Sequence, residues 1–550
     1  MDISKNKIQG ITVLYIFLAT FTLAVYLIGL FPETTVDSAK YAAVSREIYE
    51  SGDFIHLKIH GEPYDQKPPL LFWLAAISFN IFGVSIFAFK LPNLLFTFLG
   101  IYSTYRLGLL IFDKRTGIIA AIICSTSEAL FLYNMDVHTD ALLMSNIIFG
   151  IWQLAEYIDK RKILNFILGF AGVGLAMISK GAIGLAVPVI AVAGYLIVKR
   201  DWRTMFSLKW LAGLPILAIF LYPTLKGLYD QFGVDGIKFY FWTNNVDRIR
   251  GAYTSGGPDY FFVLHTIAYI YVPWSLYAYA SFVRDFRTWR GNKFSVKNFK
   301  SAYCYSVIII LALILTISSQ QSPHYLLPMI PFISIITASL INDVSFTEHY
   351  PKTYKWLLIF RNILVVLMWP MALIMITYFF PTKSLLIWIP VVVLVLLLVW
   401  SYLRLKTKIQ KLIIPLLITI IALSFVANTN YMPPALKYHG PIQASYLYNK
   451  IAPDNSVLYT YDYPQFETYF YPKNVSGLVY KEHLGDVLSA GSCWFITSET
   501  GLNEIKAYDN EIITEQHLFP YKKLTNLSLK FLNPKTRETS LQKIYLLKIR

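Results

Sequence analysis

Long apolar runs occupy most of the first 430 residues of this 550-residue chain. A helix needs about 20 residues to cross the hydrocarbon layer of a bilayer. Runs close to that length lie at residues 9–31, 87–112, 116–134, 140–158, 163–179, 181–198, 209–225, 261–283, 301–318, 325–342, 357–380, 384–403 and 411–428. Only 15% of the residues are charged, against about 25% in soluble domains. The sequence therefore predicts an α-helical polytopic membrane protein with about thirteen transmembrane helices, and it excludes a soluble or disordered chain.

The charged residues in the loops predict the orientation of these helices. The segment 284–300 holds six Lys/Arg and one Asp, whereas the loop 32–67 holds four Lys/Arg and seven Asp/Glu. Cytoplasmic loops are enriched in Lys and Arg, so we expect a cytoplasmic N-terminus held by an uncleaved anchor at 9–31. The loops expected on the outer side are 32–86, 134–140, 226–260 and 319–324.

A change of character after residue 429 predicts a second domain. Pro433-Pro434 follow the last apolar run. Strand-like stretches at 456–461, 477–480, 493–497 and 543–549 then alternate with helix-like stretches at 440–451, 481–489 and 501–507. We therefore predict a transmembrane domain at 1–429 and a small periplasmic α/β domain at 430–550.

The distribution of charge argues against nucleic acid as a partner. Residues 430–550 hold 13 Lys/Arg and 11 Asp/Glu, so nearly all of the formal charge of +16 lies on the first 429 residues. Cations spread over membrane loops are attracted to an anionic bilayer surface, whereas a nucleic-acid site is one basic patch on a domain. The lipid bilayer is therefore the expected partner.

The first outer loop contains a short amphipathic stretch that begins near Asp37. Tyr41 and Val44 fall on one face of a helix here and Lys40 on the other, which predicts a helix lying in the membrane interface. Asp37 has two interpretations. It is either an N-cap at the positive end of this helix or an active-site carboxylate.

A lysine at the end of the same loop is held in a fixed direction. Lys67 directly precedes Pro68-Pro69, and proline restricts the chain on both of its sides. The apolar run that continues to Phe82 has about 15 residues, too few to cross the bilayer, so we expect it in the interface. Lys67 suits a substrate phosphate as a point charge, or it snorkels to lipid headgroups.

The second outer loop places Asp136, His138 and Asp140 at alternate positions before an apolar run. We expect Thr139 to cap the following helix and Asp140 to lie in its first turn. An ionisable residue at the membrane edge is a candidate functional residue. The three alternating side chains are also a candidate metal cluster, although the sequence offers no fourth ligand nearby.

Three further outer positions offer a cation or a hydroxyl group. Lys180 separates two apolar runs and is either a turn residue or a phosphate contact. Arg248 has the forked donor geometry that suits phosphate, although a single Arg in a long loop is usually solvated. Tyr325 either packs in the interfacial aromatic belt or donates its hydroxyl proton to a substrate.

All of these features fall on one side of the membrane. A carboxylate among several cations at headgroup depth suits a lipid-phosphate substrate. The carboxylate acts as a general base on an acceptor hydroxyl, and the cations stabilise charge that develops on a departing phosphate oxygen. Such a leaving group needs no general acid, so the pattern indicates one-step displacement rather than the paired-carboxylate chemistry of most glycosidases.

Four motifs on this side form a recognisable set. They are Asp37-Ser38-Ala39-Lys40-Tyr41, Gly61-x5-Lys67-Pro68-Pro69, Thr139-Asp140 and Pro323-x-Tyr325-Leu326-Leu327-Pro328. They resemble the D-E-x-R-Y, G-x-P-Y-x-E-K-P-P, Thr-Asp and Y-x-L-P motifs of the GT-C membrane glycosyltransferases, in the branch of the lipid A aminoarabinose transferases and the protein O-mannosyltransferase-like proteins. The resemblance covers most of residues 9–342.

The resemblance implies a GT-C fold and a transferase that takes a sugar from a polyprenyl-phosphate carrier, with undecaprenyl phosphate as the expected carrier. It implies a multi-pass protein of the bacterial inner membrane with a periplasmic active site. The expected acceptor is lipid A or another envelope component, reached by an inverting displacement. Transfer to Ser or Thr of a protein, as in the O-mannosyltransferase-like branch, stays open.

The resemblance also assigns roles to residues. By the family pattern, Asp37 is the catalytic carboxylate and Asp140 assists it. The residues expected to bind the substrate or the carrier phosphate are Lys40, Tyr41, Lys67, Lys180, Arg248 and Tyr325.

Two departures from the family pattern bear on phosphate and metal binding. Lys40 stands where the family has Arg, which removes bidentate phosphate binding. Gln66 stands where the family has Glu, which removes a charged ligand. A divalent metal cofactor is therefore left open, with Asp136 and His138 as candidate ligands, and no other cofactor is indicated.

Two other classes of function stay open from the sequence. A flippase or transporter of lipid-linked sugars would carry charges along a path through the bilayer, whereas a glycosyltransferase gathers them at one depth. A non-catalytic envelope scaffold built around residues 430–550 would tolerate the loss of the Asp37 charge.

Overall fold

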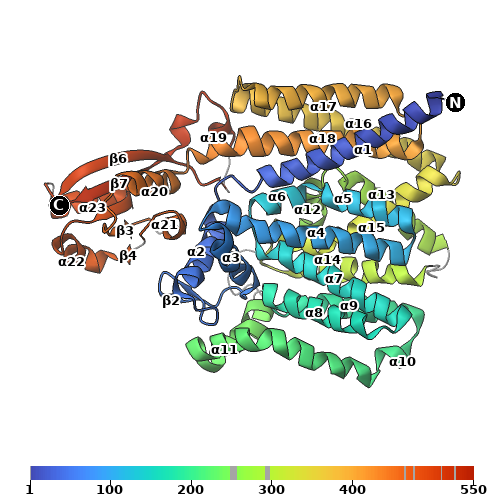
Figure 1. Ribbon diagram of the computed structural model, residues 1–550, viewed down its shortest axis with the longest axis horizontal. Helices are drawn as coiled ribbons and strands as arrows, with labels where there is room; N and C mark the ends of the chain where they lie inside the picture. Colours follow the sequence, from blue (N-terminus) through green and yellow to red (C-terminus); the bar gives the residue numbers. More distant parts are fainter. Residues whose placement is uncertain are drawn as a thin grey trace.

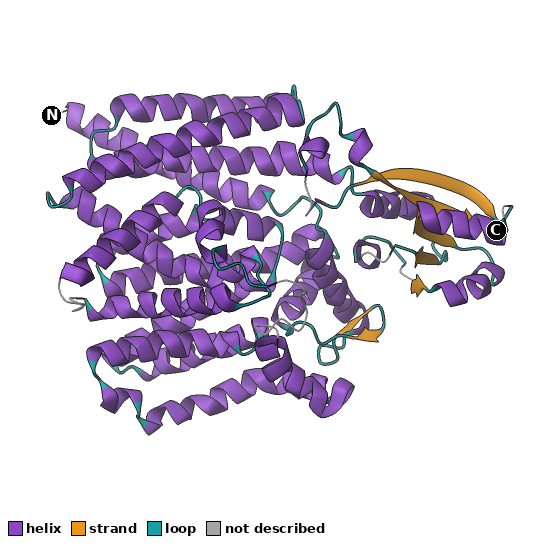
Figure 2. Cartoon of the chain, turned by 180° about the vertical axis from the view of Figure 1, so that it is seen from behind, coloured by secondary structure: helices purple, strands orange, loops and turns teal. Residues whose placement is uncertain are grey.

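The apolar runs fold into long helices that lie side by side in one bundle, and a sheet-containing part lies at one end of it (Figures 1 and 2). This computed structural model describes residues 2–247, 257–291, 298–463, 466–474, 477–509, 511–524 and 528–550. The main helices of the bundle are α1 (Asp2–Ile28), α4 (Ile86–Ile111), α5 (Lys114–Ser125), α6 (Glu128–Met135), α7 (Thr139–Lys160), α8 (Ile163–Lys180), α9 (Ile183–Lys199), α11 (Leu214–Lys238), α12 (Phe262–Ile270), α13 (Ser275–Gly291), α14 (Ala302–Ile317), α15 (Ile330–Phe346), α16 (Pro351–Ile374), α17 (Leu385–Arg404) and α18 (Lys408–Val426).

The bundle is that of a multi-pass membrane protein. Nine helical stretches among the described residues are long and apolar enough to cross a bilayer, and α5 with α6, bent by 46°, makes a tenth if the pair is one span. Each predicted run overlaps one helix or two successive helices. The apolar windows of α7, α15 and α18 are 89% buried, against 17% for α11 and α17, so the first three form the centre of the bundle and the other two its rim.

Two short helices lie at the end of the bundle that faces the sheet. They are α2 (Val36–Ser51) and α3 (Leu70–Phe82), and they run across the direction of the long helices (Figure 1). The prediction that Lys40 lies on an exposed face of α2 is wrong, although Tyr49 and Glu50 further along the helix are exposed. Tyr41 and Val44 are buried, and so are Lys40 and Ser45 on other faces, because α2 packs between α3 and α21 (Glu467–Phe470).

The C-terminal part contains a five-stranded sheet flanked by helices. The strand order is β4 (Gly477–Val479), β3 (Leu458–Tyr461), β5 (Trp494–Ser498), β7 (Gln542–Ile549) and β6 (Ile513–Tyr521). The first three strands are parallel, and β7 is antiparallel to both of its neighbours. Helices α20 (Gly440–Ile451), α22 (Leu484–Ser489) and α23 (Glu499–Tyr508) complete this part. The predicted strands and helices are confirmed, and β6 is an additional strand.

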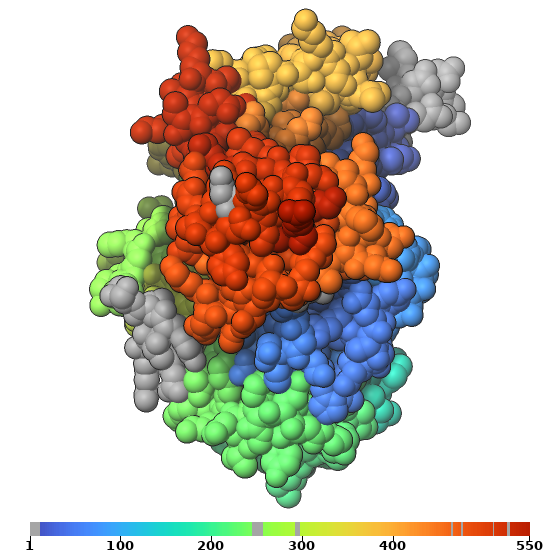
Figure 3. All heavy atoms as spheres, turned by 90° about the vertical axis from the view of Figure 1, so that its left-hand side faces the viewer, coloured from blue at the N-terminus to red at the C-terminus, as the bar shows by residue number. Residues whose placement is uncertain are grey.

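Side chains tie the C-terminal part to the bundle end that carries α2. Tyr471 donates to the backbone oxygen of Thr34 and accepts from its N–H, at 2.8 and 2.7 Å. The Arg46 guanidinium donates to the backbone oxygens of Phe470, Pro472 and Lys473. Seen end-on, the red C-terminal part therefore lies directly against the blue N-terminal segment (Figure 3).

Candidate functional site

The first half of the candidate site is the start of α2. Thr35 is the N-cap residue, and no side chain of the helix itself caps α2, so the interpretation of Asp37 as the N-cap is wrong. The N–H of Val36 instead donates to Oε1 of Glu467, at 2.6 Å, from the C-terminal part. The Asp37 carboxylate forms an ion pair with Lys40, with 2.9 Å between Oδ1 and Nζ.

The two partners of this ion pair differ in exposure. The Asp37 side chain is 45% exposed and the Lys40 side chain 11%. Burial alone would raise the pKa of the Asp37 carboxyl, but the Lys40 ammonium, with His138 and Lys67 further away, holds it below its usual value. Asp37 is therefore an ionised carboxylate that substrate can reach.

Lys40 is held among polar and aromatic groups. Its ammonium donates to Oε1 of Gln66 at 3.2 Å and lies 4.9 Å from the ring centre of Phe466 and 5.8 Å from that of Tyr41. An ammonium has three donors, and Asp37 and Gln66 occupy two of them. Lys40 can therefore direct one further proton toward a phosphate oxygen.

Lys67 follows Gln66 in the chain and lies where the first outer loop contacts α11. It lines a small cavity of about 20 Å³ together with Tyr64 and Tyr240. The side-chain amide of Asn244 donates to the backbone oxygen of Gln66 at 3.5 Å, so the end of η2 (Phe239–Asp247) approaches this position. Arg248 itself lies outside the described residues.

The second half of the site joins three segments of the bundle. Asp140, in the first turn of α7, is 3% exposed and forms an ion pair with Lys180 at the end of α8. The Lys180 ammonium lies 4.2 Å from the ring centre of Tyr325, in the helical turn η4 (Pro323–Met329). His324 of the same turn has its Nε2 atom 4.0 Å from Asp140. The first-turn position of Asp140 is confirmed, but His138, not Thr139, is the N-cap residue.

Aromatic rings connect the two halves. The rings of His138 and His324 stack with 4.6 Å between centres, and the ring of Tyr41 meets His138 edge-on at 6.1 Å. Tyr41 is only 2% exposed. The Asp37–Lys40 and Asp140–Lys180 ion pairs thus lie on two sides of one continuous cluster, at one end of the bundle.

The cluster contains a group of side chains that fits a metal ion, but its membership differs from the predicted one. Ligand atoms of His138, Asp140 and His324 all lie within 4.8 Å of one another. Asp136 pairs with His138 at 3.3 Å but is not among this group. Two imidazoles and one carboxylate suit zinc and similar divalent ions, with an open position for a further ligand. Gln66 is directed toward Lys40 instead.

Two residues of the cluster were missed from the sequence. His324 lies next to Tyr325 in a polar loop, and this position beside a predicted site residue could have identified it as a candidate. Glu467 gave no signal, because it is separated from Val36 by 431 positions and lies outside the transmembrane domain.

Comparisons with known proteins agree with this architecture. A family profile described as dolichyl-phosphate-mannose-protein mannosyltransferase matches residues 66–225. The chain is 26% identical over 320 residues to the undecaprenyl phosphate-alpha-4-amino-4-deoxy-L-arabinose arabinosyl transferase of Edwardsiella ictaluri, over 56% of this chain and 55% of the relative. A protein of the same name from Pseudomonas aeruginosa is 24% identical over 244 residues, 44% of each chain. The chain thus spans about half the length of the curated relatives that it matches.

A solved structure matches nearly the whole chain. The crystal structure of ArnT from Cupriavidus metallidurans bound to undecaprenyl phosphate has a TM-score of 0.75, with 97% of each chain covered and 14% sequence identity. At this identity the match shows the fold, which is the GT-C fold. The resemblance to GT-C proteins of the aminoarabinose transferase type, predicted from the motifs, is confirmed.

Proposed function

We propose that this GT-C protein is a membrane glycosyltransferase that moves a sugar from undecaprenyl phosphate to an acceptor of the bacterial envelope. The observation that carries the proposal is the cluster itself. An exposed carboxylate, Asp37, lies beside Lys40, and a second carboxylate, Asp140, holds Lys180 at the same end of the bundle. The relatives named above as arabinosyl transferases, and the ArnT structure with bound undecaprenyl phosphate, support this donor.

The reaction that suits this arrangement is a one-step displacement with inversion. An acceptor oxygen forms a bond to the anomeric carbon of the sugar while the bond from that carbon to the carrier phosphate breaks. The phosphate keeps the electron pair of the broken bond. Lys40, Lys67 and Lys180 would stabilise the charge that develops on the phosphate oxygen, with Tyr325 and Arg248 as further phosphate contacts.

The two carboxylates would have different roles. Asp37 is ionised and half-exposed, so it would accept the proton of an acceptor hydroxyl, or orient an acceptor that is already anionic. Asp140 is buried and ion-paired, so it would position Lys180 rather than touch the acceptor. Where His138, Asp140 and His324 hold a divalent ion, that ion would supply Lewis-acid stabilisation of the leaving oxygen.

Lipid A or a related envelope lipid is the proposed acceptor, because both named relatives above are aminoarabinose transferases. Transfer to Ser or Thr of a protein is the second candidate, and the match to a mannosyltransferase profile favours it. A flippase or transporter is less consistent with the site, because the Asp37 and Asp140 clusters lie together at one end of the bundle. We propose that this end and the C-terminal part face the periplasm, since the basic turn Lys160-Arg161-Lys162 lies at the end of α7 opposite to Asp140.

Comparative mass spectrometry of envelope lipids and glycoproteins tests the proposal and identifies the acceptor. Cells with the gene should contain a sugar adduct that cells lacking it do not, and the wild-type gene on a plasmid should restore it. A sugar on lipid A would support the first acceptor, and a sugar on Ser or Thr the second. Identical lipid and glycoprotein profiles, with the protein shown to be present in the membrane, would contradict glycosyl transfer.

A further inference from the structure

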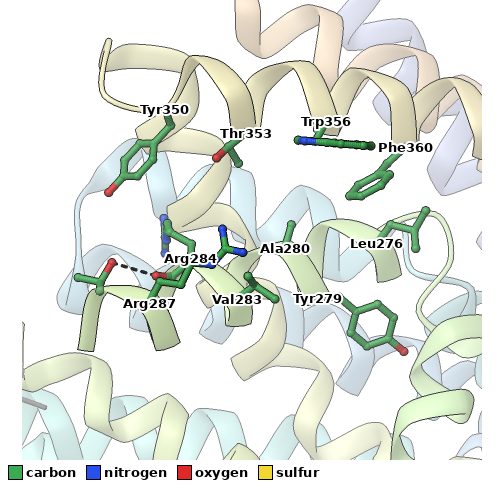
Figure 4. Close-up of a pocket in the computed structure, with 11 residues that line it drawn as sticks. Leu276, Tyr279, Ala280, Val283, Arg284, Arg287, Tyr350, Thr353, Trp356 and Phe360 are labelled. Atoms are coloured by element: carbon green, nitrogen blue, oxygen red, sulfur yellow. Dashed lines mark hydrogen bonds between the residues drawn. The ribbon is translucent and has the colours of Figure 1, made fainter. Parts of the chain in front are cut away.

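A groove between α13 and α16 lies at the other end of the bundle from the candidate site. It has a volume of about 570 Å³. Figure 4 shows Arg284 and Arg287 on its α13 side and Trp356 and Phe360 on its α16 side. One end of the groove is thus cationic, and its walls are largely aromatic and aliphatic.

The helical stretch formed by η4 and α15 gives the distance between the groove and the candidate site. Arg284 donates to Asp343 near the end of α15, and His324 lies in η4 at the beginning of the same stretch. A helix rises about 1.5 Å per residue, so His324 and Asp343 are about 28 Å apart along it. This is close to the thickness of the hydrocarbon core, about 30 Å, so the groove opens at the opposite membrane surface.

The two arginines differ in what they can offer a ligand. Arg284 donates to Asp285, Asp343 and Ser339 at 2.6, 2.7 and 2.8 Å, so its charge is compensated and it ties α13 to α15. Arg287 is exposed, and within the described part of the chain it forms no ion pair. Arg287 is therefore the lining cation that can pair with an anionic ligand.

Among the described residues, none that lines the groove is acidic. Asp285 and Asp343 share the single charge of Arg284, so one negative charge is left over behind the groove wall, and Glu348 is paired with Lys408 at 3.1 Å. Lys352, in the first turn of α16, adds a further exposed cation nearby. Arg287 and Lys352 together outweigh the one negative charge left by Asp285 and Asp343, so the exposed mouth of the groove is complementary to an anion.

The walls show which kind of anion fits. Leu276 also lines the groove, and it lies about 16 Å along α13 from Arg287 by the helical rise. Trp356 on the opposite wall is 58% exposed, and Val366, further along the same spanning helix, is 68% exposed. An inorganic anion would use only the arginine end, whereas a lipid would place its phosphate there and its chains along these apolar surfaces.

We infer that this groove binds an anionic phospholipid of the bilayer, with the phosphate at Arg287 and the acyl chains between α13 and α16. The inference goes beyond sugar transfer and does not depend on it. Phosphate recognition by a guanidinium with free donors and burial of acyl chains against apolar helix faces are the two contributions. The occupant comes from the leaflet opposite to the candidate site.

Native mass spectrometry of the purified full-length protein tests this inference with phosphatidylglycerol and phosphatidylcholine as probes. Wild type should retain phosphatidylglycerol in preference to zwitterionic phosphatidylcholine. Arg287→Gln should weaken phosphatidylglycerol binding about tenfold. The matched control is Arg290→Gln, which removes the same charge from the same helix at a position that does not line the groove.

A second variant tests the apolar part of the groove independently of the arginine. Val283→Trp changes a groove residue that is 48% exposed, so it should fill the groove without disturbing the core, and it should also weaken phosphatidylglycerol binding. Equal binding by wild type, Arg287→Gln and Arg290→Gln would overturn the inference. Displacement of the lipid by millimolar inorganic phosphate, or preference of the groove for undecaprenyl phosphate over phosphatidylglycerol, would overturn the assignment to a phospholipid.

Discussion

The Asp140–Lys180 ion pair gives the sharpest prediction about the construction of the site. Asp140 is 3% exposed and Lys180 15%, so removing one partner leaves a charge in a poorly hydrated place. Breaking a buried pair in this way costs about 3–5 kcal/mol. Nε2 of His324 lies 4.0 Å from the carboxylate and can turn a ring N–H toward it, so we expect Lys180→Met to cost about 3 kcal/mol, at the lower end of that range.

Substitution of the other partner, Asp140, should lower the free energy of unfolding by less. Asp140→Asn leaves Lys180, which is the more exposed partner and also lies over the ring of Tyr325, so we expect a loss of about 2 kcal/mol. The double variant should lose about 3 kcal/mol rather than the sum, because neither charge is then left alone. The expected coupling energy is therefore about 2 kcal/mol.

The assay is equilibrium unfolding of the purified protein in mixed micelles, monitored by tryptophan fluorescence. Lys199→Met is the matched control, because Lys199 forms a partly exposed pair with Asp201 at 3.3 Å, and such pairs contribute at most about 1 kcal/mol. If the two single changes at Asp140 and Lys180 add to within about 0.5 kcal/mol in the double variant, the buried pair is refuted.

Three further predictions concern the chemistry of the cluster. The Lys40 ammonium holds the pKa of the Asp37 carboxyl low. Lys40→Met should therefore raise that pKa and move the acidic limb of the pH–activity profile to higher pH, whereas Lys40→Arg should leave the limb in place. An unchanged acidic limb in Lys40→Met would disprove the coupling between the two side chains. Lys67→Ala should weaken binding of undecaprenyl phosphate about tenfold in a lipid competition assay, and unchanged binding would remove Lys67 from the site. His324→Ala should lower the zinc content of zinc-equilibrated protein, measured by elemental analysis. The control is His265→Ala, which changes an exposed histidine and should leave the zinc content unchanged. Equal zinc content in both variants would exclude His324 as a ligand.

The helices could be predicted from the sequence because a lipid-facing or buried span must be apolar along its whole length. Strand β6 could not be predicted, because its residues show no comparable apolar pattern. It is the edge strand of the sheet and most of its residues are exposed or partly exposed, so no alternation of apolar residues marks it. Pro520 also lies within it, and proline argues against a strand unless that strand is at an edge.

The candidate site could be predicted in part. The first outer loop brings together Asp37, Lys40 and Gln66. The motifs that contain these residues were sufficient to predict their proximity. The alternating Asp136, His138 and Asp140 suggested a metal cluster, but alternation brings side chains together only in a strand. The chain here enters α7 at Thr139, which separates Asp136 from Asp140 and brings in a ligand from a distant segment instead.

The interpretation of Asp37 as a helix cap failed because the cap comes from far along the chain. Glu467 accepts from the N–H of Val36 and is fully buried at the contact between the C-terminal part and α2. Local sequence contains no information about such a partner. The C-terminal part thereby helps to fix the helix that carries Asp37.

The proposed function requires Asp37 to take part in sugar transfer from a polyprenyl-phosphate donor. The most direct measurement is the rate of transfer by wild type and Asp37→Asn in proteoliposomes that contain undecaprenyl-phosphate-linked sugar and extracted envelope lipids, with products identified by mass spectrometry. We expect Asp37→Asn to insert normally but to lose about 4 kcal/mol of transition-state stabilisation, roughly a thousandfold in rate. Transfer by Asp37→Asn at the wild-type rate would contradict the proposed function.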